Sequence, residues 1–143
     1  MPIGAFISSA TIMSVLSFNP ILGHMTTFGG HPVCCAAGLA TLDTLLNEKI
    51  VEHVDEKGNY FRSLLIHPAI KEIRGKGLML AIAFESFEIN KKIIDACIED
   101  GVISDWFLHC SNAMRIAPPL IITKDEIAET CKIILRNIQK VCS

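Results

Sequence analysis

The sequence predicts an α+β fold in which a short, mostly antiparallel sheet is covered by helices. Residues 78–84 form a continuous apolar run that is short enough to be one buried strand. Residues 102–107 and 113–117 are two further short runs, separated by a polar pair, Ser111 and Asn112, that favours a turn. We therefore expect an antiparallel pairing of these two strands, with Pro118 and Pro119 ending the second.

The helices that cover this sheet have clear start and stop signals. Thr123 and Glu126 match the T-x-x-E capping box, in which each side chain satisfies a free backbone donor of the other residue. The residues that follow repeat at helical spacing and give one apolar face: Ile127, Cys131, Ile134 and Ile138. A further helix is expected over residues 88–100, with Gly101 at its C-terminal end.

The first part of the chain predicts different structure. Residues 3–7 read as a short buried strand, and Ser8 and Ser9 offer N-cap oxygens for a helix that ends near Leu16. Residues 18–31 then form an irregular stretch that is longer than a simple connection requires, and long loops of this kind often carry function.

Two helices are expected next, the first from Pro32 to Asn47 and the second over residues 49–65. We interpret them as a connector over residues 32–65. It joins the end of a larger domain, residues 1–31, to a small α+β domain, residues 66–143. Gly75 and Gly77 are expected to bracket a turn before the apolar strand.

Composition excludes several classes of partner. The formal net charge is −2, and the Lys and Arg residues are scattered, so neither nucleic acid nor an anionic membrane is an expected partner. The uncharged residues 18–42 are interrupted by Pro and Gly and are not expected to span a membrane. Met1 opens no signal peptide, and we expect a cytoplasmic protein.

The six cysteines contain no CxxC pair, and reduced, partly buried thiols are expected. Cys34 and Cys35 lie near His24 and His31, which suggests a metal site as an alternative. Successive helical residues point about 100° apart, however, which suits two ligands of one ion poorly. We therefore expect no metal.

The segment from Thr26 to Pro32 has the features of a phosphate-binding loop. Thr26 and Thr27 supply hydroxyls, Gly29 and Gly30 let the backbone approach a ligand, and a helix N-terminus follows at once. An ordinary loop with a helix cap explains the same residues, because Gly-Gly turns are common. The residues alone leave both interpretations open.

Four motifs resemble the class III aminotransferases in their order and spacing. They are Met1-Pro2-Ile3-Gly4-Ala5, Thr27-Phe28-Gly29-Gly30-x-Pro32, Arg74-Gly75-x-Gly77-Leu78 and Arg115-Ile116-x-Pro118-Pro119-Leu120. The resemblance covers nearly the whole chain and implies the C-terminal part of a fold type I enzyme that uses pyridoxal 5'-phosphate. In that family the lysine that holds the cofactor precedes the first motif, so the resemblance implies that it lies upstream of Met1.

The same resemblance implies roles for individual residues. Thr27 resembles the hydroxyl residue that reaches the cofactor phosphate of the neighbouring subunit of a homodimer, and Thr26 stands where a second hydroxyl residue is frequent. Arg115 resembles the arginine that receives a substrate carboxylate, a task suited to its planar donor fork. His31 replaces the usual Asn and is interpreted as a variant of the helix start. Arg74 is left out of the predicted site, because a turn alone explains its glycine neighbours.

The implied reaction moves an amino group from an amine donor of acetylornithine or ornithine type to a 2-oxo acid, with no catalytic residue in this chain. A decarboxylase, aminomutase or racemase on the same scaffold is one alternative, and a folded fragment without cofactor is another. The nine lysines all fall in turns or on polar helix faces. We therefore expect the chain alone to be inactive and to form no specific covalent adduct with the cofactor.

Overall fold

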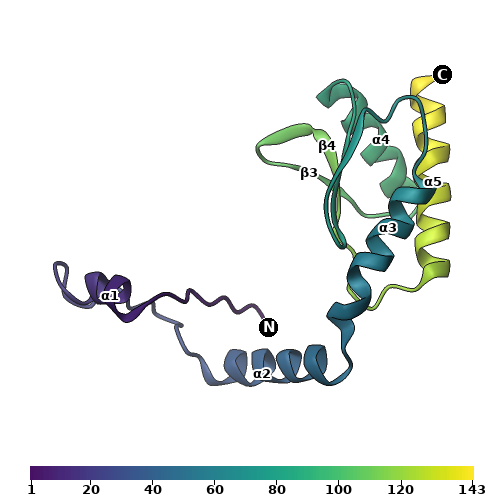
Figure 1. Ribbon diagram of the computed structural model, residues 1–143. Coiled ribbons are helices and arrows are strands. Elements are labelled where there is room, and N and C mark those ends of the chain that lie inside the picture. The colour runs from purple at the N-terminus through teal and green to yellow at the C-terminus, as the bar shows by residue number, and fades with distance from the viewer. The chain divides into compact units, whose positions relative to one another are not determined.

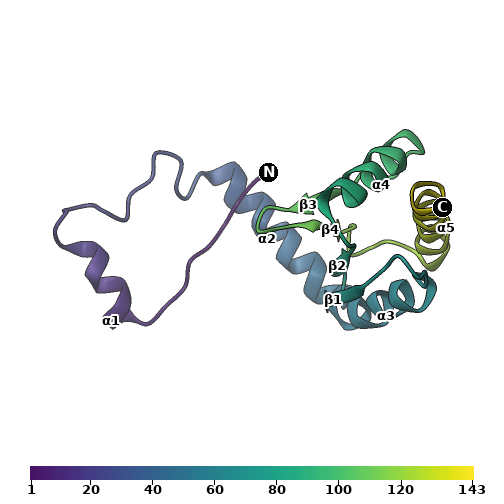
Figure 2. The ribbon, with the colours of Figure 1, turned by 90° about the horizontal axis from the view of Figure 1, so that it is seen from above.

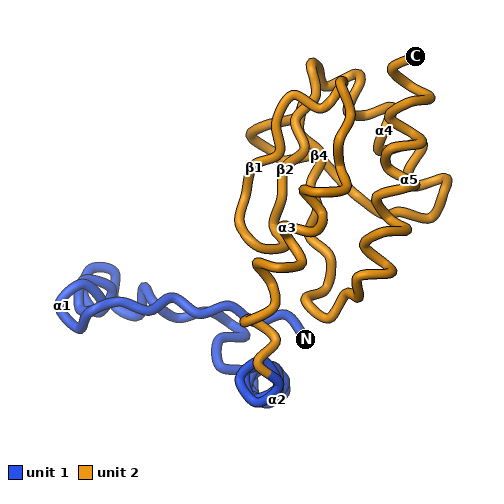
Figure 3. The backbone as a smooth tube through the Cα atoms, turned by 45° about the vertical axis from the view of Figure 1, so that its right-hand side comes forward, with its two compact units in different colours: residues 1–48 blue, residues 49–143 orange.

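The computed structural model describes residues 1–143, which divide into two compact units, residues 1–48 and residues 49–143 (Figure 3). Every buried residue lies in the second unit. No helix in the structure combines the length with the apolar composition that crossing a membrane requires.

The second unit is a small α+β domain with helices on one side of a sheet. Its elements in chain order are η2 (Ile50–His53), α3 (Val54–Leu64), β1 (Glu72–Lys76), β2 (Met79–Ala83), α4 (Phe87–Glu99), β3 (Asp105–Phe107), β4 (Cys110–Ile116) and α5 (Lys124–Cys142) (Figure 1). The strand order is β1-β2-β4-β3, and all neighbours are antiparallel. The helices α3, α4 and α5 lie together on one face (Figure 2). The predicted fold class is confirmed.

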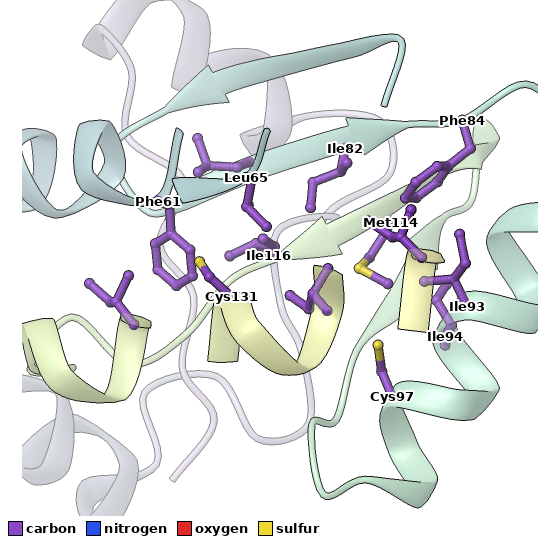
Figure 4. Packing of buried hydrophobic residues seen from close by; sticks show 14 of the residues in the cluster. Phe61, Leu65, Ile82, Phe84, Ile93, Ile94, Cys97, Met114, Ile116 and Cys131 are labelled. Atoms are coloured by element: carbon purple, nitrogen blue, oxygen red, sulfur yellow. The ribbon is translucent and has the colours of Figure 1, made fainter. Parts of the chain in front are cut away.

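The core lies between the sheet and these three helices. Alternate residues of the two central strands are buried in this core: Leu80 and Ile82 of β2, and Met114 and Ile116 of β4. Figure 4 shows Ile82, Met114 and Ile116 pointing toward the helices. Each fully buried aliphatic side chain stabilises the fold by about 1.5–3 kcal/mol. Because successive side chains of a strand point to opposite faces of the sheet, the residues between them lie on the other, helix-free face.

The hairpin between β3 and β4 confirms the predicted antiparallel pairing, but its turn lies at other residues than the sequence predicted. Ser111 and Asn112 lie within β4, and the turn is formed by Leu108 and His109. The prediction was wrong because Asn112 uses its side chain within the sheet: its amide donates to the carbonyl of Phe84 at 3.0 Å.

The sequence analysis missed strand β1. Gly75 does not flank a turn but lies inside β1, where it pairs with Leu80 at a φ of +127°. A Cβ at this position would lie 2.1 Å from the carbonyl oxygen of Met79, so only glycine allows this strand conformation. The turn that joins β1 to β2 contains Gly77, at a φ of +53°.

Helix α5 begins as the capping box predicts. Thr123 Oγ1 accepts from the backbone N–H of Glu126 at 3.2 Å, and Glu126 Oε2 accepts from the N–H of Thr123 at 2.8 Å. Helix α4 ends just before Gly101, whose φ of +90° is the left-handed conformation expected beyond a helix end.

The first unit contains only helices and irregular backbone: α1 (Ala10–Met13), η1 (Ser14–Ser17) and α2 (Pro32–Asn47). The predicted α2 is confirmed, and Ser9 is the N-cap of α1 as expected. The predicted strand over residues 3–7 is absent, since an isolated apolar run has no strand with which to pair. The predicted helix over residues 49–65 starts as the 3₁₀ turn η2 after Lys49, whose φ is +52°.

Candidate functional site

Thr26 and Thr27 lie together at the edge of one hollow within residues 1–48. Its volume is about 720 Å³, and it is lined by residues 1–4, 26–31, Cys34 and Cys35. Both threonines are exposed. The structure therefore brings together the two hydroxyl residues that the sequence analysis singled out.

The two glycines of this loop are used differently. A Cβ at Gly29 would lie 2.5 Å from Thr26 Oγ1, so the glycine makes room for the hydroxyl against the backbone. Gly30 has a φ of +70° and no atom near its missing Cβ. Tight turns connect the segment, with the N–H of Gly29 donating to the carbonyl of Thr26 at 3.2 Å.

Helix α2 begins directly after this loop. Pro32 is its first residue, and His31 takes the N-cap position without a side-chain capping hydrogen bond. The free backbone amides and the positive end of the helix dipole therefore stay available to an anion. His31 occupies the helix start, as interpreted from the sequence.

These residues fit the phosphate of pyridoxal 5'-phosphate. The hollow offers two hydroxyls, open space beside the Cα of Gly30, and an uncapped helix N-terminus. Each of these groups stabilises a dianion, and hydrogen bonds to a charged acceptor are stronger than neutral ones.

Arg115 lies in β4 on the helix-free face of the sheet. It is directly opposite Ala81 of β2 on one side and Asp105 of β3 on the other. Its Nη2 is 3.6 Å from Asp105 Oδ2, which is longer than a hydrogen bond of about 2.7–3.2 Å. The guanidinium thus has a carboxylate nearby but donates no side-chain hydrogen bond, so its donors remain open to a ligand.

Sequence reasoning missed Arg74 as a neighbour of this site. Arg74 of β1 pairs with Ala81, so that Arg74, Ala81, Arg115 and Asp105 form one row across the four strands. Both arginines line a hollow of about 490 Å³, together with Ala81 and the hairpin residues 107–110. The observation that places Arg74 near the site is that both arginines lie on the same face of the sheet. This can be recognised only when the strand register is known.

Arg74 is held by two contacts on the surface of the sheet. Its Nη1 donates to Glu72 Oε2 at 2.9 Å, and its Nη2 donates to Cys110 Sγ at 2.9 Å. The hydrogen bond to Glu72 and then that to Cys110 raise the pKa of Arg74 above its ordinary value. The side chain therefore stays positively charged at neutral pH.

The lysines of the chain all lie in residues 49–143, and none is buried. Lys57 is half-buried, and its Nζ donates to the carbonyl of Leu120 at 2.7 Å. The pKa of Lys124 is raised, chiefly by its hydrogen bond with Glu56. A raised pKa disfavours the neutral amine that a nucleophilic lysine needs.

A protein-family model for class III aminotransferases matches residues 1–138. The chain belongs to this family. Among solved structures, it resembles an acetylornithine aminotransferase from Elizabethkingia anophelis at 36% identity, with a TM-score of 0.71 over 82% of this chain and 32% of that one. It also resembles the ornithine aminotransferase from Toxoplasma gondii at 33% identity, with a TM-score of 0.76 over 92% and 32% of the two chains.

A further solved relative is a thermostable omega transaminase variant, at 27% identity and a TM-score of 0.77, of which the chain covers 32%. This class III chain therefore spans about a third of the length of the solved structures that it matches. Class III aminotransferases use pyridoxal 5'-phosphate, and the structure from Toxoplasma gondii has this cofactor at partial occupancy in its active site.

Proposed function

We propose that this chain is the C-terminal region of an aminotransferase that moves an amino group from a donor of acetylornithine or ornithine type to a 2-oxo acid. The main observation behind the proposal is the position of Arg115. Its guanidinium donors are free to bind a ligand on the helix-free face of the sheet, and this sheet lies within the residues that match the family model. The two relatives at 36% and 33% identity, named for acetylornithine and ornithine, support this donor class.

We infer that Thr26 and Thr27 hold the cofactor phosphate, and that they do so for the neighbouring subunit of a homodimer. The cofactor, when bound, supplies an electron sink for chemistry at the carbon that bears the amino group. The role of this loop is binding: its hydroxyls and the amides at the start of α2 would hold the phosphate and orient the group attached to it.

Arg115 is proposed to bind a substrate carboxylate. A carboxylate accepts two parallel N–H bonds from a guanidinium, which fixes its orientation as well as its position. Asp105, 3.6 Å away, keeps the side chain aligned across the strands when no substrate is present. The carboxylate of the substrate would replace this longer contact with shorter hydrogen bonds.

The substitution Arg115→Lys in the complete enzyme tests this role. Lysine keeps the charge but loses the bidentate fork, so kcat/KM for dicarboxylic acceptors should fall by the equivalent of about 1.5–3 kcal/mol. Steady-state kinetics with an amine donor that lacks a carboxylate should show a much smaller loss. Equal losses for donors with and without a carboxylate would show that Arg115 supports the fold or the cofactor instead.

The substitution Thr27→Ala tests the cofactor contact. Removing one hydrogen bond to a charged acceptor should weaken cofactor retention by about 1.5–3 kcal/mol, measured as faster release on dilution. Thr41→Ala is the matched control, since the Thr41 hydroxyl donates within α2 to the carbonyl of Ala37 at 2.9 Å. An unchanged release rate in Thr27→Ala would reduce Thr27 to an ordinary loop residue.

We further propose that no lysine of this chain forms the covalent link to the cofactor. Borohydride trapping of the isolated chain with pyridoxal 5'-phosphate, followed by peptide mapping, should give scattered, substoichiometric labelling. One stoichiometric site would contradict the proposal.

A further inference from the structure

We propose that Arg74 is a second carboxylate-binding residue beside Arg115, and that the hollow between them selects dicarboxylic substrates. This inference rests on the proposed function, because it assigns the second charge of the same substrate. The residue lay outside the site predicted from the sequence, and its place follows from the strand register.

The register puts both arginines on one face with a single small residue between them. Arg74 and Arg115 are each directly opposite Ala81, from β1 and β4 respectively. Their Cα atoms are therefore two strand spacings apart, about 9.5 Å. Since Ala81 has only a methyl group, the space above it is left to the two long side chains and to whatever they bind.

The hollow contains both positive charges and neither of the neighbouring negative charges. Arg74 and Arg115 both line it, whereas their carboxylate partners, Glu72 and Asp105, do not. The acids contact the arginines from outside the hollow. An anion that enters it therefore has two arginine side chains beside it, 44% and 43% accessible, and no carboxylate among the residues that line the hollow.

Arg74 has N–H donors that make no hydrogen bond within the protein. Arg74 uses one N–H for Glu72 and one for Cys110 Sγ, so the rest of its donor fork stays available. The hairpin residues 107–110 close one side of the hollow. Because the two Cα atoms are about 9.5 Å apart, we expect the separated carboxylates of a five-carbon diacid to engage both arginines and a compact anion such as phosphate to engage one.

The test is a titration of the 143-residue chain, observed through the side-chain Nε–H signals of its arginines by NMR. Glutarate, butyrate and inorganic phosphate are the probes. Glutarate should shift the signals of both Arg74 and Arg115 and bind about tenfold more tightly than butyrate. Phosphate binding as tight as that of glutarate would overturn the selectivity for dicarboxylates.

Two variants separate ligand binding from support of the fold. Arg74→Gln should reduce glutarate affinity to that of butyrate while leaving butyrate affinity unchanged. Glu72→Gln removes the internal partner of Arg74 but keeps the guanidinium, and glutarate affinity should be retained or increased. If Glu72→Gln reproduced the loss seen in Arg74→Gln, Arg74 would act through its ion pair, and the inference would be wrong.

The control is Lys132→Gln, which removes one positive charge from an exposed position of α5, outside the hollow. Glutarate affinity should stay the same; an equal loss would show that only net charge matters and would overturn the inference. The outcome for Arg115→Gln reports separately on the proposed function. Loss of affinity in Arg115→Gln with no change in Arg74→Gln would leave that function standing and remove Arg74 from the site.

Discussion

The two units of this chain have similar apolar side chains but use them in opposite ways. In residues 49–143 the apolar residues form one core between a sheet and three helices. In residues 1–48 no residue is buried, although Phe6, Ile7 and Ile21 are large and apolar. Hydrophobic content alone therefore does not make a core; the apolar residues must also repeat along an element in a way that gives it one face to bury.

The contrast is sharpest between two long helices. In α5 the buried residues recur every three or four positions, and the opposite side is charged. Helix α2 has no charged residue in its first turn or its last turn and no buried residue. Alanines and leucines occur around its circumference, which is typical of a helix that is surrounded by other protein. We interpret residues 1–48 as a segment that does not form a core by itself.

The largest effect is expected from separating the units. Residues 49–143 expressed alone should fold and show one cooperative unfolding transition, because they retain the whole buried cluster. Residues 1–48 alone should show none. Circular dichroism during heating measures both. A cooperative transition in residues 1–48, or its loss from residues 49–143, would break the comparison.

The thiols give a second contrast. Burial raises the pKa of Cys131 to about 12 and that of Cys97 to about 11. Both should react with iodoacetamide at least about a hundredfold more slowly than exposed Cys35 of the first unit, because labelling requires local opening. Cys142 is the control: it is exposed but belongs to the second unit, so it should react fast. Mass spectrometry of timed samples gives the rates.

The same pKa values predict a pH dependence. The Cys131 thiol has an ordinary pKa of 9.0 when unfolded, so between about pH 9 and 12 the folded state binds more protons than the unfolded state. The stability that Cys131 contributes is thus complete below pH 9 and is lost as the pH rises. Cys131→Val should show a shallower fall in unfolding free energy above pH 9 than the parent. An identical slope would exclude this thiol as a cause.

Several elements of both units were predictable from local patterns. The helix start at Pro32 in the first unit, and the capping box at Thr123 and the central apolar strand in the second, each depend on a few neighbouring residues, and the structure confirms them. Strand β1 was not predictable, because Gly75 has the composition of a turn and becomes part of a strand only when β2 pairs with it.

The candidate site divides in the same way. The resemblance of short motifs was enough to single out Thr26, Thr27 and Arg115, and the structure puts the two threonines in one hollow. Arg74 was set aside because a turn alone explained its glycine neighbours, and its position relative to Arg115 depends on the register of three strands. Sequence spacing does not contain that information, since the two residues are far apart in the chain and neither lies on the β2 strand that joins them.

Two Gly→Ala substitutions, one in a helix of each unit, test how tightly each unit is packed around a single added methyl group. A Cβ at Gly58 of α3 would lie 2.1 Å from the backbone oxygen of Gly77, so Gly58→Ala should cost about 3 kcal/mol despite the better helix propensity of alanine. Gly38→Ala in α2 meets only the side chain of Ile3 at 3.3 Å. It should leave the unfolding free energy unchanged and slightly increase helicity. Urea unfolding measures both variants, and a loss in Gly38→Ala similar to that in Gly58→Ala would show that α2 is packed as tightly as α3.

The smallest effect concerns the two helix caps. Thr123 completes a capping box on α5, whose apolar face is part of the core, so fraying of its first turn weakens that packing. Thr123→Ala should therefore reduce the unfolding free energy by about 1 kcal/mol. Ser9 Oγ accepts from the N–H of Ile12 at 3.4 Å, but it caps a four-residue helix that has no buried residue. Ser9→Ala should leave the urea midpoint unchanged, because the cap is linked to no cooperative core. Equal shifts in the two variants would mean that α1 unfolds together with the second unit, and the distinction between the two regions would fail at the level of cooperativity.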